Sequence, residues 1–216
     1  MDIGTLKKLR SVVPGSLIIL ELVPLYTYWT GTPLSELSKG DWLLAGVMSV
    51  VAYAVGMLYN VYCVRALFNR KSHSRITENI KQRLLAMGRT APIPDEMRQA
   101  LLTGSALMDT FYSLVDSKDS LKEKAKLVRD NGLAWSSIAD VVVLGALFAC
   151  LYLPLWYSTK YSLLLYWGAI SGALALLSAL FFHPRAERRH ITLSNEQLDF
   201  IQTQMKDEVE TKVNSL

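Results

Sequence analysis

Residues 11–30 read SVVPGSLIILELVPLYTYWT, an apolar run with a glutamate, Glu21, near its middle and a proline on either side of it. The run matches the roughly 20 residues that a helix needs to cross about 30 Å of hydrocarbon. A cleaved signal peptide is the alternative, because three basic residues precede the run. The internal glutamate and the bulky ending YTYW argue against cleavage. We therefore interpret residues 12–30 as a membrane-crossing helix.

Three further apolar segments have a similar length and cover residues 42–65, 138–157 and 161–182. The chain of 216 residues is 51% hydrophobic, with a mean hydropathy of +0.22, and its apolar and charged stretches are sharply separated. This composition predicts an all-α, polytopic membrane protein with four transmembrane helices. They would form two hairpins, within residues 1–65 and 137–183.

The distribution of Lys and Arg predicts the orientation of these helices. The stretch from residue 65 to residue 131 holds thirteen Lys or Arg against eight Asp or Glu, whereas the two short connections hold one basic residue each. Loops rich in Lys and Arg stay in the cytoplasm. We expect a multi-pass protein of the inner membrane with both termini cytoplasmic. The net charge of +4 follows from this bias and from contact with anionic lipid, so direct binding of nucleic acid is not expected.

Residues 66–136 carry the periodicity of helices and predict a cytoplasmic helical layer. Apolar side chains recur at helical spacing in residues 72–89 and again in residues 95–115, which follow the breaker TAPIP. A third helix begins near residue 119. We expect it to stop at Asn131 and Gly132, a typical helix ending.

The tail, residues 184–216, predicts an amphipathic helix that restarts after Pro184. Ser194 and Gln197 have the spacing of a capping box at its start. The apolar stripe that follows consists of Leu198, Ile201, Met205 and Val209. This stripe has to bury against something: a coiled coil between subunits and docking onto the loop helices are both open.

Glu21 is the sharpest functional candidate, because a carboxylate near the bilayer centre has to be partnered, hydrated or protonated. Polar groups that could meet it inside the bundle are Tyr53, Tyr59, Asn60 and Ser171. No basic residue lies at its depth, so we expect a neutral, hydrogen-bonded or water-facing group. It either lines an ion or proton pathway or holds helices together. Asp140 is expected at a helix N-terminus in the membrane interface.

Small residues predict close helix contacts, since they let backbones approach in a membrane. Gly56 ends such a face in the second apolar segment, and Gly168 and Gly172 form one in the fourth. Whether these contacts lie within one subunit or between subunits stays open. The three histidines are isolated and are expected at the surface. No motif predicts a metal, a cofactor or a catalytic centre.

Three stretches carry a resemblance to a known class: LRSVVPGSLIILELVPLY (9–26), AYAVGMLYNVY (52–62) and FYSLVDSKDSLKEKAKLVRDNGLAWSSIAD (111–140). They resemble prokaryotic membrane proteins associated with phage defence, among them the four-helix membrane subunit of Kiwa-type systems. The resemblance implies a membrane sensor or effector that works with a cytosolic partner.

We therefore expect a homo-oligomeric sensor or scaffold subunit of the inner membrane, which is not an enzyme and which recruits or regulates a cytosolic protein. The alternative is a pore-forming effector or a small ion or proton transporter with Glu21 in its pathway. Four helices per chain are few for a transporter, so that alternative also requires an oligomer.

Overall fold

The structure is a computed structural model that describes residues 3–37, 42–62, 64–89 and 93–216, and all regular structure in these residues is helical. The chain divides into two compact units. We call Met1–Asn69 together with Leu133–Arg185 the apolar unit, and Arg70–Gly132 together with Ala186–Leu216 the polar unit. Each is described by itself.

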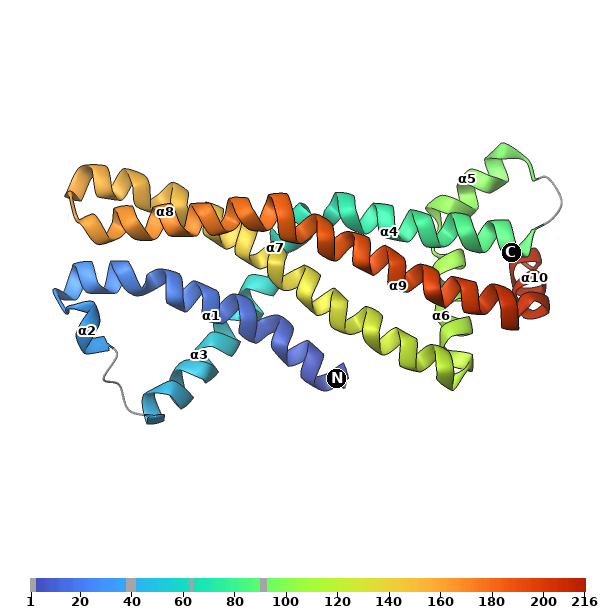
Figure 1. Cartoon of the computed structure of the whole chain (residues 1–216), viewed down its shortest axis with the longest axis horizontal. Helices are drawn as coiled ribbons and strands as arrows, with labels where there is room; N and C mark the ends of the chain where they lie inside the picture. The colour runs from blue at the N-terminus through green and yellow to red at the C-terminus, as the bar shows by residue number, and fades with distance from the viewer. Residues whose placement is uncertain (1–2, 38–41, 63, 90–92) are drawn as a thin grey trace. The chain divides into compact units, whose positions relative to one another are not determined.

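The apolar unit begins with two packed helices, α1 (Ile3–Thr30) and α3 (Trp42–Val61), which cross each other in Figure 1. The short α2 (Leu34–Leu37) lies between them in sequence. α1 ends at Gly31, whose φ of 70° is a left-handed helix ending that glycine adopts without strain. The N–H of Gly31 donates to the Thr27 carbonyl at 3.0 Å and completes the last turn.

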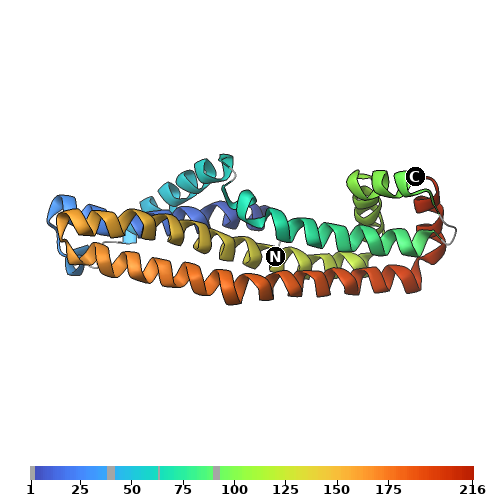
Figure 2. The same cartoon turned by 90° about the horizontal axis from the view of Figure 1, so that it is seen from above.

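The second half of the apolar unit is a hairpin made by the end of α7 (Asp119–Thr159) and by α8 (Ser162–Leu177), which lie side by side in Figures 1 and 2. The chain reverses at Lys160, a non-glycine residue with a φ of 58°. Tyr152 and Leu164 are fully buried, and they form a core with Phe148. Leu25, Trp156 and Trp167 pack against this core.

Three helices are long and apolar enough to cross a membrane: Gly4–Thr30, Asp119–Thr159 and Ser162–Gln204. A fourth span results if α3 and the following α4 (Val64–Gly88) count as one bent span. Their apolar side chains are mostly not covered by the chain itself. The exposed ones include Leu20, Val50, Leu58, Leu147, Ile170, Leu174 and Leu177. Such a surface is typical of a multi-pass membrane protein.

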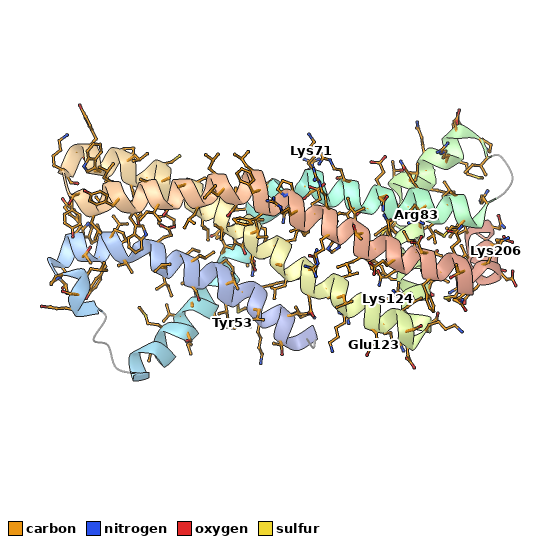
Figure 3. The ribbon with its side chains drawn as sticks, in the orientation of Figure 1. Tyr53, Lys71, Arg83, Glu123, Lys124 and Lys206 are labelled. Carbon is orange, nitrogen blue, oxygen red and sulfur yellow. The ribbon has the colours of Figure 1, made fainter. Side chains whose placement is uncertain are left out.

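The polar unit is built from α4, α5 (Asp95–Thr103), α6 (Ala106–Ser117), the first part of α7, α9 (His183–Gln204) and α10 (Lys206–Asn214). Its interior is mainly apolar, and the fully buried side chains include Leu84, Leu107, Leu114, Leu121, Leu198, Ile201 and Val213. Arg83 and Lys124, labelled in Figure 3, pair with Asp199 and Glu196 of α9 at 2.6 Å and 3.9 Å. This unit therefore has its own core and a charged exterior.

The expected helix end at Asn131 and Gly132 is wrong, because α7 continues through both residues. A glycine ends a helix when it takes a positive φ, and among the described glycines only Gly31 does so. Asn131 is instead a packing residue whose Nδ2 donates to the Ala186 carbonyl at 3.1 Å. Tertiary contact overrides the local stop signal at this point.

The expected restart after Pro184 is also wrong. The helix runs from α8 through a π-helical turn, Ser178–Phe182, into α9, which contains Pro184. Proline lacks the N–H that would bond the carbonyl four residues earlier, and a π-helical adjustment is one way in which a helix accommodates this loss. Ser194 and Gln197 are buried inside α9 and do not cap it.

The predicted helix at residues 95–115 is divided into α5 and α6 by an extended residue, Gly104. The ammonium of Lys81 on α4 is buried at this break and donates to the carbonyls of Leu102 and Gly104, both at 2.7 Å. These carbonyls lie at the end of α5, where they lack helical partners. Lys81 therefore ties the end of α5 to α4.

Candidate functional site

Glu21 lies in the second half of α1, and its carboxylate contacts α8. The hydroxyl of Ser171 lies 2.8 Å from Oε1 and 2.9 Å from Oε2, so a single donor serves both oxygens. Ser171 itself is buried. Among the partners predicted for Glu21 from the sequence, the structure brings Ser171 to it.

Two aromatic residues complete the surroundings of Glu21, and neither was predicted. The side chain of Trp167, one helical turn before Ser171 on α8, lies near the carboxylate. The hydroxyl of the fully buried Tyr152 on α7 donates to the backbone carbonyl of Glu21. Residues 167 and 171 are four positions apart, which places them on one helix face. This spacing was the sequence signal for Trp167.

Tyr53, Tyr59 and Asn60 were predicted to face Glu21, but the structure assigns their side chains elsewhere. Tyr53 on α3 is 39% exposed, and Figure 3 labels it on that helix. Tyr59 and Asn60 belong to a second polar cluster, formed by α1, α3, α4 and α7. The rotation of α3 about its axis determines which of its side chains face Glu21, and the hydropathy of the sequence does not indicate that rotation.

An ion pair between Asp140 and Arg65 is the centre of the second cluster. Nε of Arg65 lies 3.2 Å from Oδ1 of Asp140, whose side chain is completely buried. The guanidinium carbon of Arg65 lies 6.0 Å from the centre of the Tyr59 ring. Among the described residues, neither the buried hydroxyl of Tyr59 nor either carboxylate oxygen of Asp140 has a hydrogen-bond partner, so Arg65 contributes an ion pair only. The expectation that Asp140 sits at a helix N-terminus is wrong, because Asp140 lies inside α7.

Asn60 and Arg65 also repair a defect in α1. Pro14 has no N–H to donate to the carbonyl of Arg10, four residues earlier, so that carbonyl lacks its helical partner. Asn60 Nδ2 donates to the carbonyl of Arg10 at 3.2 Å, and a terminal nitrogen of Arg65 does so at 3.4 Å. Asn60 Nδ2 also lies 3.1 Å from the hydroxyl of Ser11. The cluster thus supplies donors to the carbonyl of Arg10 and a counter-charge to the buried carboxylate of Asp140.

The predicted small-residue positions all lie at close helix contacts within this chain. A Cβ on Gly56 would collide with the backbone carbonyl of Ser11 on α1. A Cβ on Gly168 would lie 3.0 Å from the Cβ of Tyr152, and one on Gly172 would lie 3.3 Å from the Cβ of Ala149. Gly56 therefore serves the contact of α3 with α1. Gly168 and Gly172 serve the contact of α8 with α7.

The apolar stripe of the tail lies inside the polar unit. Leu198, Ile201, Met205 and Val209 are each less than 5% exposed. Of the two arrangements left open by the sequence, the structure has the stripe packed within the chain. These side chains do not offer a surface to another protein in this arrangement.

His183 is buried, so the expectation of a surface histidine is wrong at this position. Its Nε2 lies 2.8 Å from Oδ1 of Asn69, and its ring stands edge-on to Phe68 with 4.9 Å between ring centres. Within the described ranges, no three His, Cys, Asp or Glu side chains come together as metal ligands.

The apolar unit contains two polar clusters among helices with exposed apolar side chains. One joins α1, α7 and α8 through Glu21, and the other joins α1, α3, α4 and α7 through Asp140. Comparison of the chain with protein-family models, curated proteins and solved structures finds no significant match.

Proposed function

We propose that this chain is a subunit of the inner membrane whose polar unit lies in the cytoplasm and recruits or regulates a cytosolic protein, as a sensor or scaffold. The contrast between the two units carries this proposal. Large apolar side chains face outward on the apolar unit, where lipid would cover them. The polar unit buries its apolar residues in its own core, and it presents charge to its surroundings.

The polar clusters support a scaffold more than a transport pathway. Both oxygens of Glu21 are bound by a donor from the same chain, and Asp140 is buried against an arginine. Polar groups that are paired between helices help to fix the arrangement of membrane helices. The small-residue contacts at Gly56, Gly168 and Gly172 are made inside one chain. A homo-oligomer would therefore assemble through other surfaces.

Co-purification from the native host tests the proposal. The full chain, solubilised in detergent, should retain a cytosolic protein at a fixed ratio. Leu198→Asp places a charge in the core of the polar unit and should abolish retention, while the chain remains in the membrane fraction. Leu198→Met keeps the core apolar and is the matched control. Repeated recovery of the unmodified chain alone would refute the proposal.

The resemblance to membrane proteins associated with phage defence suggests the biological setting. If the protein acts there, a bacterial strain that carries its gene with the neighbouring genes should show fewer plaques than the same strain with Leu198→Asp. Equal plaque numbers over a range of phages would count against this setting.

A pore-forming effector or a small transporter is the second candidate. Glu21 is only partly buried, and it lies in the second half of a helix that could cross the membrane; both facts favour this candidate. Such a protein would carry ions or protons across liposomes, and Glu21→Gln would change the flux while preserving the shape of the side chain. Absence of flux with the unmodified chain would remove this candidate.

A further inference from the structure

A groove of about 290 Å³ lies on the polar unit, along the end of α4 and one side of α5. Figure 1 shows these two helices beside each other. The groove is lined by Gln82, Leu85, Ala86, Arg89, Ile93, Arg98 and Leu102. Its volume is close to the lower limit for pockets that bind small molecules. None of the functions considered above uses it.

The charge in this groove is unbalanced. It contains two arginines, Arg89 and Arg98, and its lining has no carboxylate. Within the described part of the chain, neither arginine has an acidic partner at ion-pair distance, whereas Arg75 and Arg83 on the same α4 are both paired. Unlike those two, Arg89 and Arg98 are available for an anion from outside the chain.

The guanidinium of Arg89 has fewer hydrogen-bond acceptors than it has donors. Its Nε is buried and has no hydrogen-bond partner among the described residues. Its Nη1 contacts the Sδ of Met97 at 3.7 Å, and a thioether is a weak acceptor. A buried guanidinium nitrogen without an acceptor is unfavourable, and an oxyanion in the groove would satisfy it.

Two hydrogen bonds join the helices that form the walls of the groove. Lys81 joins α4 to the end of α5 through the carbonyls of Leu102 and Gly104. Leu85 is buried in the same unit, and the groove also contains the apolar side chains of Ala86, Ile93 and Leu102. The two guanidinium groups therefore border a partly apolar floor.

We propose that this groove binds an organic phosphate monoester. A phosphate monoester carries a charge of about −1.5 to −2 at pH 7, which matches two arginines. Its oxygens suit the planar fork of a guanidinium. The phosphate would lie between Arg89 and Arg98, and its organic part would rest on Leu85, Ile93 and Leu102. A soluble metabolite and a lipid headgroup that ends in a phosphate monoester share this chemistry.

Calorimetric titration of the full chain in detergent with phenyl phosphate tests the proposal. We expect saturable binding of phenyl phosphate, weaker binding of inorganic phosphate and no binding of phenol. Arg89→Gln and Arg98→Gln should each weaken the binding of phenyl phosphate at least tenfold. Arg189→Gln removes an exposed arginine of α9, outside the groove, and should leave binding unchanged.

Two further measurements keep the test decisive. Thermal unfolding of each variant should match that of the unmodified chain, which separates lost binding from lost folding. Arg98→Lys keeps the charge but loses the planar fork, so its affinity should fall between those of the unmodified chain and Arg98→Gln. The proposal is overturned if phenyl phosphate does not bind at millimolar concentration, or if it binds equally to the folded Arg89→Gln and Arg98→Gln variants.

Nanodiscs distinguish the two sources of the phosphate. The chain is reconstituted in phosphatidylcholine with and without phosphatidic acid, and the titration with phenyl phosphate is repeated. A lower apparent affinity of the unmodified chain for phenyl phosphate in the discs that contain phosphatidic acid assigns the groove to a lipid headgroup. Unchanged binding of phenyl phosphate in both discs assigns it to a soluble organic phosphate.

Discussion

At the scale of single residues, the two side chains of the Arg65–Asp140 ion pair differ in their exposure. The side chain of Asp140 is completely buried, whereas that of Arg65 is 15% exposed. Breaking a buried pair is most harmful when the remaining charge has no route to water. The two partners therefore differ in what their removal should do.

Replacing Arg65 by methionine should destabilise the chain by about 3 kcal/mol or more, because it leaves Asp140 buried without a counter-charge. Asp140→Leu should be milder, since Arg65 can turn toward the surface. The double variant Arg65→Met/Asp140→Leu should recover most of the stability lost in Arg65→Met. Unfolding in detergent, followed by tryptophan fluorescence, measures all three. Equal losses in the two single variants would contradict the assignment.

The Ser171 hydroxyl should be coupled energetically to Glu21. Ser171→Ala removes the donor to both carboxylate oxygens and should lower the free energy of unfolding by about 1 to 3 kcal/mol. In a Glu21→Leu background the same change should have almost no effect, because the acceptor is gone. Ser162→Ala, an exposed change at the start of α8, is the control. Equal effects of Ser171→Ala in both backgrounds would exclude the coupling.

At the scale of helices, α7 and α8 pack through three glycines, and the space available for a Cβ differs from one glycine to the next. A Cβ on Gly145 would lie 2.7 Å from the carbonyl oxygen of Ser171. Because that oxygen belongs to the backbone, the backbone of one of the two helices would have to shift. The corresponding approaches at Gly168 and Gly172 are 3.0 Å and 3.3 Å, both to side-chain Cβ atoms. At Gly46 on α3 a Cβ would meet nothing within 4 Å.

Alanine at these four positions should therefore lower stability in a fixed order. We expect Gly145→Ala to lower the free energy of unfolding by about 1 to 3 kcal/mol. Gly172→Ala should have the smallest effect of the three contact positions, because the added Cβ is farthest from its neighbour there. Gly46→Ala should be neutral or slightly stabilising, because alanine is the better helix former. Thermal melting of the purified variants gives the order. If Gly46→Ala lowered the stability as much as Gly145→Ala, the helix contact would not be the cause of the loss.

The sequence predicted helices and apolar segments better than helix ends. Segment length and hydropathy are properties of the chain itself, so residues 12–30 and 138–157 fall within helices, and the segment 161–182 begins one residue before α8. Asn131 and Pro184 are local signals, and packing overrode both of them. Ser171 was predicted as a possible partner of Glu21, but the pairing of Asp140 with Arg65 was not predicted. Their pairing depends on contacts between segments that are distant in sequence.

At the scale of the whole molecule, the contrast between apolar and polar surface leads to a prediction about the membrane. Basic residues concentrate between residues 65 and 131, which favours a cytoplasmic location for that stretch and for both termini. A fluorescent protein fused after Leu216 should fluoresce in cells, and alkaline phosphatase fused there should be inactive. Fusions at Lys160 should give the opposite result. Active phosphatase at the C-terminus would reverse the proposed topology.

The contact between Glu21 and Ser171 has a consequence for biosynthesis. The two residues are 150 positions apart, so a ribosome that adds about 5 to 20 residues per second makes Ser171 roughly 8 to 30 s after Glu21. During co-translational insertion, α1 would enter the bilayer with its carboxyl group before the serine that binds it exists. The insertion machinery or a bound proton would have to shelter Glu21 for that interval. The nascent chain is therefore most vulnerable to membrane quality control before α8 is made.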